Sequence, residues 1–357
     1  MSLILGIETS CDECSASVLE HVKGEYRPIS VSTYSQIELH QPYGGVVPEV
    51  ASRNHLEQID PVIWDALEKA KVSVGEVDAI AVTNRPGLIG ALLVGVTAAK
   101  ALAYASSKPL VPVHHLEGHL MSAFLKMPKT TVNLTVSQIQ FPAVFLMVSG
   151  GHTHIHSIES PPEGWSQQVL KDSIFGRSLD DAAGEAFDKT AKILGFPYPG
   201  GKWIDIEAAK GGNPAAFELP RGLKQKDSLD FSFSGLKTAV ALLADRLKRE
   251  GVLDSVIPDV CASVQEAIID PLIRKTLALQ KMKKAKSIVI VGGVAANSRL
   301  RARFEQDSPV PVIYPDLQYC TDNAAMIAAA GAVRFAQGHF LQPEAFLKLN
   351  AFAIAEH

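Results

Sequence analysis

Two histidines lie four residues apart in the segment His115-Leu116-Glu117-Gly118-His119. On a helix this spacing places both imidazoles on one face, where they can bind one metal ion together. A zinc peptidase of this type has its catalytic glutamate directly after the first histidine, a position that is Leu116 here. Glu117 would be rotated about 160–200° away from the histidines. The pattern therefore predicts a metal site without a peptidase base; the alternative is that the imidazoles only cap or pack the helix.

Composition and net charge describe a globular enzyme without a broad basic surface. The chain has 357 residues, of which 47% are hydrophobic and 20% charged, and its length favours two lobes. The formal net charge is −4, so no global field attracts nucleic acid or anionic lipid. A nucleic-acid partner must then be bound locally. Two basic clusters are either solvated helix faces or local RNA contacts, namely Lys281–Lys286 and the trio Arg299, Arg301 and Arg303.

Cysteine use and the apolar segments indicate a cytoplasmic protein that does not enter a membrane. Four cysteines are too few and too scattered for a disulfide scaffold, and the pair Cys11 and Cys14 lacks the second pair that a zinc site of this kind needs. The short apolar run at the N-terminus has no basic segment, which predicts a first strand rather than a signal peptide. Lys100 interrupts the apolar segment Leu88–Tyr104, which is shorter than the about 20 residues that cross a bilayer, so we expect a buried core helix.

The elements that must position the site include two segments of one design. Leu3–Ile7 and Ala143–Val148 are each typical of a strand, and each is followed by a short polar turn and a second apolar stretch. The turns Glu8–Glu13 and Ser149–Thr153 offer hydroxyls and backbone N–H groups, which can bind phosphate at the tip of a hairpin. Two such hairpins predict a duplicated lobe.

A third glycine turn and an acidic stretch complete the candidate elements. The turn Gly292–Asn297 follows an apolar strand pattern at Ser287–Val291 and precedes a helical one, which favours an anionic ligand; the alternative is an ordinary strand-to-helix turn. It lacks the spacing of the dinucleotide fingerprint. Asp181, Glu185 and Asp188 would share one helix face. This face is either solvated or a site for a cation or a hydroxyl-rich ligand. Strand and helix patterns alternate, so we expect an α/β fold.

Motifs that run in order along nearly the whole chain carry a resemblance to a known family. They are Gly6–Glu13, Tyr43–Glu49, His115–His119, Ser149–Thr153, Asp181–Lys189, Phe231–Lys237, Gly292–Asn297 and Thr321–Ala325. In these motifs the chain resembles the bacterial-type tRNA adenosine threonylcarbamoyltransferases, formerly called O-sialoglycoprotein endopeptidases. Agreement of so many motifs in order is far more specific than any one of them.

The resemblance implies a two-lobed fold like that of the actin, sugar-kinase and Hsp70 ATPases (ASKHA), with duplicated ribonuclease-H-like lobes. Residues 1–113 plus about 323–357 would form the N-terminal lobe. Residues from about 114 to 322 would form the C-terminal lobe, which would carry most nucleotide and metal ligands.

The resemblance also implies a site. The ligands of one divalent metal ion map onto His115, His119 and Asp322, with iron favoured by the family and zinc as the alternative. Asp322 alone would also suit the N-cap of an Ala-rich helix over Asn323–Ala332. An adenine nucleotide (threonylcarbamoyl-AMP, ATP or AMP) maps onto a larger set: Met147, Val148, Ser149, Gly150, Gly151, Asp188, Gly201, Asp205 and Asn297.

The implied activity is transfer of a threonylcarbamoyl group from threonylcarbamoyl-AMP to the exocyclic amine of the adenosine next to the anticodon, in tRNAs reading ANN codons. An adenine amine is a poor nucleophile, so metal-assisted polarisation of the acyl phosphate is expected. We expect Asp12 or Glu13 to accept the amine proton; the alternative is that both are solvated turn carboxylates. Competing functions are a small-molecule kinase of the same fold, a non-catalytic ATP-binding partner and a metallopeptidase.

The expected partners are tRNA, threonylcarbamoyl-AMP, a paralogous TsaB-like subunit and a TsaE-like ATPase. The chain departs from the family at Arg85, where glycine is usual, and at Cys14, where threonine is usual. The segment Met127–Phe141 looks longer than in typical bacterial members and is predicted to be an insertion or an extended loop.

Overall fold

Two mixed β-sheets organise the chain, one in each of two units. The computed structural model describes residues 1–126, 139–223 and 228–354. The first unit comprises Met1–Gln138, Pro161–Trp165 and Pro315–His357, and the second comprises Ile139–Ser160 and Ser166–Tyr314. Most of the predicted insertion, residues 127–138, lies outside the described residues.

The first sheet combines antiparallel and parallel pairing. Strands β1 to β3 pair antiparallel, whereas β4 and β5 continue the sheet parallel to β1. The spatial order is β3-β2-β1-β4-β5. The strands are β1 (Ser2–Glu8), β2 (Glu13–Val22), β3 (Glu25–Ser35), β4 (Ala79–Arg85) and β5 (Leu110–His114). The first predicted hairpin is therefore present as β1 and β2.

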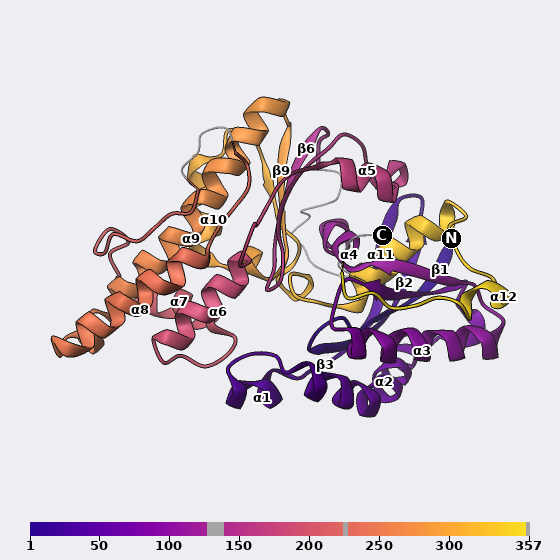
Figure 1. The fold of residues 1–357 in the computed structure, drawn as a ribbon. Helices are drawn as coiled ribbons and strands as arrows, with labels where there is room; N and C mark the ends of the chain where they lie inside the picture. Colours follow the sequence, from indigo (N-terminus) through magenta and orange to yellow (C-terminus); the bar gives the residue numbers. More distant parts are fainter. Residues whose placement is uncertain (127–138, 224–227, 355–357) are drawn as a thin grey trace. The chain divides into compact units, whose positions relative to one another are not determined.

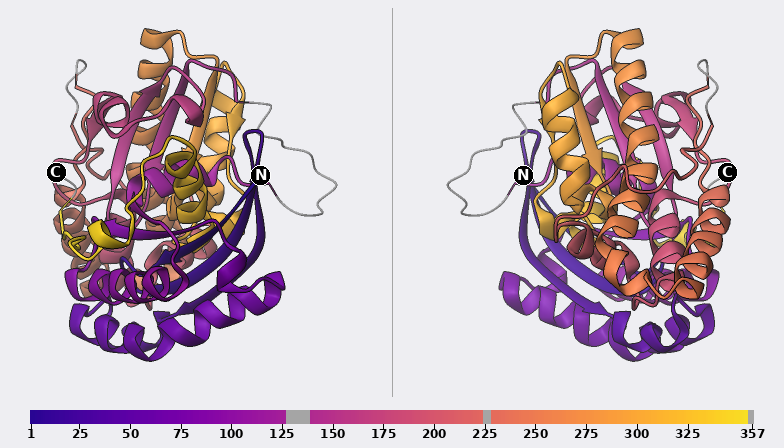
Figure 2. Two further views of the ribbon diagram at one scale, coloured as in Figure 1. Left: turned by 90° about the vertical axis from the view of Figure 1, so that its right-hand side faces the viewer. Right: turned by 90° about the vertical axis from the view of Figure 1, so that its left-hand side faces the viewer.

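Helices cover both faces of this sheet. Figure 1 shows α2 and α3 on one face and α4 and α11 on the other. The turned views in Figure 2 again show the strands of this sheet lying against α2 and α3. Leu5 and Ile7 of β1 pack into the apolar core with α2 and α3. Gly6 faces α11, where a Cβ would lie 2.4 Å from the carbonyl oxygen of Ala324, so this close approach requires glycine. The helices are α1 (Ile37–His40), α2 (Pro48–Ala70), α3 (Ile89–Ser106), α4 (His115–Ser122), α11 (Ala324–Ala336) and α12 (Pro343–Phe346).

Helix α3 passes the length and composition test for a membrane span, alone among the helices of the described residues. One of its faces, with Leu92 and Val96, belongs to the core that α2 and the sheet share. Leu93 and Tyr104 on its other side are exposed. The position of α3 in the core agrees with the core helix predicted for Leu88–Tyr104.

The second sheet repeats the topology of the first. Its spatial order is β10-β9-β6-β7-β8. β6, β7 and β8 pair antiparallel, and β9 and β10 continue the sheet parallel to β6, as β4 and β5 do beside β1. The strands are β6 (Ala143–Val148), β7 (Thr153–Ile158), β8 (Ile174–Arg177), β9 (Ser287–Val291) and β10 (Val312–Ile313). The shared order and direction confirm the duplication that the two hairpins predicted.

Most helices of the second unit lie between β8 and β9 in the chain. The 31-residue helix α9 packs against α7 and against β6 of the sheet, while α6 packs against α7 and α8. The helices are α5 (Gln167–Asp172), α6 (Ala183–Ile193), α7 (Gly200–Ala208), α8 (Ser234–Arg249), α9 (Leu253–Lys283) and α10 (Ser298–Asp307).

The unit boundaries differ from those expected at residues 113 and 322. Residues 114–126 and 315–322 belong to the first unit. The reason is structural: β5 runs directly into α4, and α4 packs against α11. The three predicted metal ligands therefore lie in the first unit, whereas the predicted nucleotide residues lie in the second.

Candidate functional site

His115 and His119 come from a helix that begins where a strand ends. β5 ends at His114 and α4 begins at the next residue. The side chain of His114 accepts a hydrogen bond from the backbone N–H of Leu116 and so caps the helix. The helical repeat then brings the imidazoles of His115 and His119 to one face, with ring centroids 4.6 Å apart.

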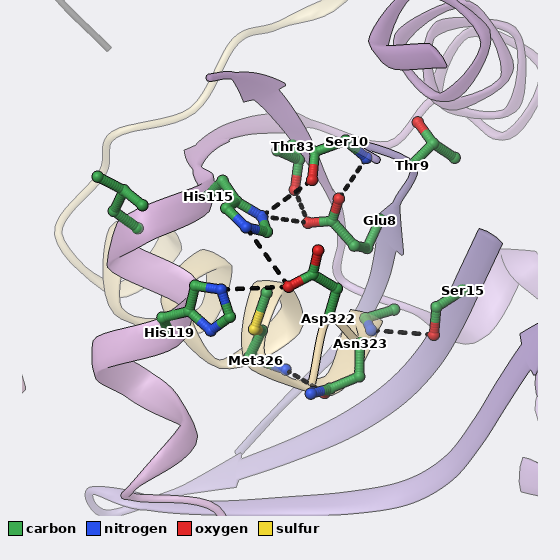
Figure 3. Close-up of polar contacts among 12 residues, drawn as sticks. Glu8, Thr9, Ser10, Ser15, Thr83, His115, His119, Asp322, Asn323 and Met326 are labelled. Atoms are coloured by element: carbon green, nitrogen blue, oxygen red, sulfur yellow. Dashed lines mark hydrogen bonds and ion pairs between the residues drawn. The ribbon is translucent and has the colours of Figure 1, made fainter. Parts of the chain in front are cut away.

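Asp322 precedes helix α11 but does not cap it. The cap is Asn323, whose side chain accepts a hydrogen bond from the backbone N–H of Met326. This corrects the expectation that Asp322 caps the helix. Its carboxylate faces the histidines instead, with Oδ1 3.2 Å from His119 Nε2 and 3.6 Å from His115 Nε2 (Figure 3).

These three side chains suit a metal ion. One ligand atom from each lies within 4.8 Å of the other two, an arrangement that no other such group of side chains has in the described part of the chain. His119 is fully buried: its Nδ1 makes no hydrogen bond to a described residue, and its Nε2 lies 3.2 Å from Oδ1 of Asp322 without the geometry of a hydrogen bond. Burying an imidazole without hydrogen bonds is unfavourable. Coordination would satisfy one nitrogen, and two imidazoles with one carboxylate suit zinc or iron and leave coordination positions open.

Glu8, at the end of β1, holds His115 in place. Its Oε2 accepts hydrogen bonds from His115 Nδ1 at 3.1 Å and from Thr83 Oγ1 at 2.6 Å, and its Oε1 accepts one from the backbone N–H of Ser10. Because Nδ1 donates to Glu8, Nε2 of His115 is the nitrogen that faces Asp322 (Figure 3). Glu8 was not among the residues that we expected in the site.

Charges within this cluster shift two pKa values. Burial raises the pKa of Glu8, but the charge of His115 and the hydrogen bond from it outweigh burial, so the pKa lies below its usual value. Burial lowers the pKa of His115, but the carboxylates of Asp322 and Glu8 outweigh it and raise the pKa. His115 without metal therefore retains a proton, which a metal ion must displace on binding.

Glu117 points away from the histidines, as its position on the helix predicted. Its two carboxylate oxygens accept hydrogen bonds from Nε of Arg334 at 3.1 and 2.9 Å, and Arg334 also donates to the carbonyl oxygen of Pro112 at 3.1 Å. The Glu117 and Arg334 side chains are only 7% and 9% exposed. This buried pair joins α4 to α11, the two helices beside the metal ligands. Glu117 cannot act as a peptidase base, so the geometry excludes that interpretation.

Asp12 and Glu13 lie at the turn between β1 and β2. Asp12 is buried, whereas Glu13 is partly exposed and its Oε1 accepts a hydrogen bond from Ser35 Oγ at 3.3 Å. Burial is the largest cause that raises the pKa of Glu13, followed by the negative charges of Asp12 and Asp322. Glu13 therefore differs from an ordinary solvated turn carboxylate.

The two positions at which the chain departs from the family pattern also lie in the first unit. Cys14 is fully buried in the core beside Ile7, and burial raises the pKa of its thiol to about 12. Arg85 ends β4, where burial and then the charge of Arg334 lower its pKa. Neither position belongs to the predicted metal or nucleotide residues.

The turn Ser149–Gly151 joins β6 to β7 in the second unit. The backbone N–H of Ser149 donates to the carbonyl oxygen of His152 at 2.8 Å, and the N–H of His152 donates to Ser149 Oγ at 3.2 Å. No described atom would lie within 4 Å of a Cβ on Gly150 or Gly151. The side of Gly150 and Gly151 on which a Cβ would project is therefore open to an approaching ligand, whereas Gly184 packs against the backbone of Gly150.

The glycine turn after β9 lies beside the end of β6, next to the Ser149–Gly151 turn. Gly292 has φ +94°, and a Cβ there would lie 2.5 Å from the carbonyl oxygen of Val148, so only glycine fits without strain. Met147 and Val148 are fully buried in β6, and they therefore offer backbone rather than exposed side chains. The turn Gly292–Asn297 and the end of β6 thus lie side by side, as a shared ligand would require.

The remaining predicted nucleotide residues cluster at helix N-termini. Asp188 accepts a hydrogen bond at 2.7 Å from the backbone N–H of the first residue of α7, and Gly201 is the second residue of that helix. Asn297 caps α10. Asp205 accepts hydrogen bonds from the backbone N–H and the hydroxyl of Ser298 at 3.0 and 2.7 Å. Helix N-termini favour anionic ligands.

The acidic stretch is organised differently from the expectation. Helix α6 begins at Ala183, so Asp181 precedes the helix and the three carboxylates do not form one helix face. Lys189 lies 2.6 Å from Asp181 and 2.9 Å from Glu185, and Asp188 is turned to α7. A lysine of the chain itself therefore pairs with two of the three carboxylates, which argues against a site for a free cation.

The arginines of α10 also bind within the second unit. Arg299 and Arg303 both pair with Glu266. Arg301 lies over the ring of Tyr314, with 4.5 Å between its guanidinium carbon and the ring centroid. These contacts favour a structural role for this basic cluster over an RNA contact.

The duplicated sheet topology agrees with solved structures. The activator of the 2-hydroxyisocaproyl-CoA dehydratase from Clostridium difficile with bound ADPNP aligns over 94% of this chain and 97% of its own, with a TM-score of 0.52 and 14% identity. HypF of T. kodakarensis aligns over 94% of this chain and 48% of its own, with a TM-score of 0.53 and 14% identity. The chain therefore has the α/β fold class of the ASKHA ATPases.

Sequence comparison then identifies the family within this class. The family model described as "TsaD: tRNA N6-adenosine threonylcarbamoyltransferase" matches residues 28–329, and the chain belongs to this family. Proteins with that name are 47% identical over 350 residues in Anaeromyxobacter dehalogenans (96% of this chain, 97% of the relative) and 45% identical over 341 residues in Polaromonas naphthalenivorans (94% and 90%). A third, from Bacillus cereus, is 46% identical over 355 residues (98% and 95%).

Proposed function

We propose that this chain, a transferase by family, moves the threonylcarbamoyl group of threonylcarbamoyl-AMP to the exocyclic amine of the adenosine next to the anticodon in tRNAs reading ANN codons. The amine nitrogen forms a bond to the carbamoyl carbon and loses a proton, while the bond from that carbon to the phosphate oxygen breaks and AMP leaves. The observation that carries the proposal is the cluster of His115, His119 and Asp322, supported by Glu8, in a chain of this family. A small-molecule kinase needs no histidine pair, because carboxylates hold Mg²⁺.

The donor set of the first unit suits iron or zinc, and we favour iron. A divalent ion held there would polarise the acyl phosphate and stabilise charge on the departing AMP. The chain's own residues prepare that site: Glu8 fixes the ring of His115, and the carboxylate of Asp322 faces both imidazoles. Asp12 or Glu13, at the turn between β1 and β2, would accept the amine proton; burial and the neighbouring carboxylates raise the pKa of Glu13 above that of a solvated carboxylate.

The second unit would bind the adenine nucleotide. The open backbone of Gly150 and Gly151 suits a phosphate, and the turn Gly292–Asn297 suits the nucleoside beside it. Asp188, Gly201 and Asp205 would complete this subsite at the start and along the length of α7. The solved activator with bound ADPNP has the same fold class, which is consistent with a nucleotide here.

We further propose that the protein works in the cytoplasm with a TsaB-like subunit and a TsaE-like ATPase. The formal balance of 34 basic and 38 acidic residues predicts weak binding of tRNA by this chain alone, because phosphate neutralisation dominates such affinity. Arg299 and Arg303 both pair with Glu266 of this chain, which also favours weak binding of tRNA. Titration of labelled tRNA at several salt concentrations tests this; submicromolar affinity at physiological salt with full turnover and no partner would contradict it.

The function itself is tested by incubating the metal-loaded protein, with its expected partners, with threonylcarbamoyl-AMP and unmodified tRNA. Nucleoside mass spectrometry should detect threonylcarbamoyladenosine, and high-performance chromatography should detect AMP in equal amount. The Asp322→Ala variant should lose the product, whereas Asp60→Ala, an exposed acidic residue on α2, should retain it. Hydrolysis of a protein substrate, or phosphorylation of a small molecule by ATP, in place of this product would refute the proposal.

A further inference from the structure

A cavity of about 330 Å³ lies in the second unit beside the turn that joins β6 and β7. Its size is within the range of small-molecule sites rather than that of an extended RNA surface. The cavity lies beside the predicted nucleotide site and shares one residue with it, Gly151. The lining residues are Gly151, His152, Thr153, His154, Arg177, Ser178, Leu179, Asp180 and Ala182.

Arg177 and His154 face this cavity from neighbouring strands. They are opposite each other in the pairing of β7 with β8, so their side chains share one face of the sheet. His152 is two residues before His154 and projects to the same face. The guanidinium of Arg177 makes no ion pair or side-chain hydrogen bond within the described residues. An arginine without a partner at a concave site is a ready ligand for an anion.

The carboxylate of Asp180 makes no ion pair with Arg177 among the described residues and is turned to Ser232 and Ser234. Asp180 accepts hydrogen bonds from the hydroxyls of Ser232 and Ser234 at 2.6 and 2.8 Å and from the backbone N–H of Phe233 at 2.7 Å. Burial and the charge of Arg177 lower the pKa of His154 to about 4, so His154 is neutral near pH 7. Arg177 is the one arginine or lysine among the lining residues, and a single anionic group suits it.

The cavity and the nucleotide elements follow one another along one edge of the sheet. The parallel strands β9 and β6 end at this edge, β7 begins there and β8 ends there. In the order β9-β6-β7-β8 the edge carries the Gly292–Asn297 turn, then the Ser149–Gly151 turn, then the cavity. Neighbouring strands are about 4.8 Å apart, so this row spans about 14 Å.

We infer that this cavity binds the carboxylate of the threonine part of the donor, with Arg177 as its ligand. The inference rests on the proposed function, because the donor there is an acyl-adenylate with two anionic groups. With adenosine at the Gly292–Asn297 turn and phosphate at the Ser149–Gly151 turn, the acyl end of the donor continues along the edge to Arg177. Arg177 would then be a specificity-determining residue: it would select an acyl group that ends in a carboxylate, since a guanidinium binds a carboxylate through two parallel hydrogen bonds.

The test measures the affinity of the full-length protein for two probes, AMP and threonylcarbamoyl-AMP, in the absence of tRNA. In Arg177→Gln the affinity for threonylcarbamoyl-AMP should fall by about ten- to one-hundred-fold, the loss of a charge-assisted contact, while the affinity for AMP stays within twofold. Arg177→Lys should restore part of the loss, because it keeps the charge but not the planar fork. Arg246→Gln, an exposed arginine on α8, serves as the matched control and should change neither affinity.

A donor analogue made from threoninamide, which lacks the carboxylate, sharpens the test. Wild-type protein should bind the analogue about as weakly as Arg177→Gln binds the natural donor, and Arg177→Gln should bind both equally, because each change removes the same contact. Equal loss of AMP and donor affinity, or no loss of either, would overturn the inference. So would a change confined to the salt dependence of tRNA binding, which would assign Arg177 to an RNA phosphate. Failure of wild-type protein to bind AMP would instead count against the proposed function.

Discussion

The hydrogen bonds of Glu8 predict how strongly this residue supports metal binding. In Glu8→Gln the side chain keeps its size and one acceptor oxygen, but an NH₂ group replaces the other oxygen. Oε1 accepts from the N–H of Ser10, and Oε2 accepts from both His115 and Thr83. Either orientation of the amide therefore places a donor against a donor, and the charge that favours Nδ1–H of His115 is lost.

The expected effect follows from the bond that is lost. A hydrogen bond to a charged group contributes about 1.5–3 kcal/mol, so we expect the metal affinity of Glu8→Gln to fall by about ten- to one-hundred-fold. Thr83→Val removes one neutral donor to Glu8 and leaves the charge, and should weaken metal binding by less than about tenfold. Glu49→Gln, whose side chain is 75% exposed on α2, is the matched control and should change nothing.

The assay is a titration of metal-free protein with Zn²⁺ or Fe²⁺ against a chromophoric chelator of known affinity. Thermal unfolding of each variant without metal shows whether the fold is retained. Metal affinity of Glu8→Gln equal to that of wild type, in a protein that unfolds at the same temperature, would refute the reasoning. The two histidines would then be oriented by the packing of α4 alone.

Four further results are expected. Asp322→Ala should purify with less than half the metal of wild type; undiminished stoichiometry by elemental analysis would remove Asp322 from the site. Gly292→Ala places a Cβ 2.5 Å from a backbone carbonyl at φ +94°, so the rise in melting temperature with millimolar AMP should shrink or vanish, and an unchanged rise would contradict the predicted contact. Glu117→Ala leaves Arg334 buried without a counter-ion and should destabilise the first unit by about 3–5 kcal/mol in urea unfolding, whereas a loss below about 1 kcal/mol would show that the pair is unimportant. Burial lowers the pKa of His156 to about 3 from an unfolded value of 6.5, so the neutral histidine contributes stability above pH 6.5 that is lost as the pH falls towards 3. Between pH 7 and pH 5 this loss is about 2 kcal/mol. His156→Gln should remove this part of the pH dependence of unfolding.

Local patterns in the sequence predicted the strands and turns that carry the site. The strands after which ligands were expected, Ala143–Val148 and Ser287–Val291, end where the structure ends them. Strand alternation and a polar turn are local signals, so they can be recognised without knowledge of the fold. The spacing of His115 and His119 likewise needs only the helical repeat, and it also placed Glu117 on the opposite side.

The contacts that join distant segments were not accessible in this way. Glu8 reaches His115 across 107 residues, and Arg334 reaches Glu117 across 217 residues. A signal for Glu8 did exist: it ends β1 on the side of Gly6, which faces a helix, and a buried carboxylate there needs a partner. The N-cap was assigned one residue early because Asp322 and Asn323 are both good caps, and only packing decides between them. The units of the structure also divide elsewhere than at residue 113, since α4 packs against α11 in the first unit.

The late position of α11 in the chain has a consequence for biosynthesis. Strand β5 and the two histidines leave the ribosome about 200 residues before Asp322 and the helix that covers Gly6, and strand β1 leaves earlier still. At about 5–20 residues per second this interval lasts about 10–40 s, during which one sheet face of the nascent first unit lacks α11 and only two of the three proposed metal ligands are present. If the proposed site holds a metal ion, its three ligands are complete only near the end of synthesis, and a chain that stalls before Asp322 lacks the carboxylate ligand. Such a fragment would expose an apolar surface for chaperones and proteases to recognise.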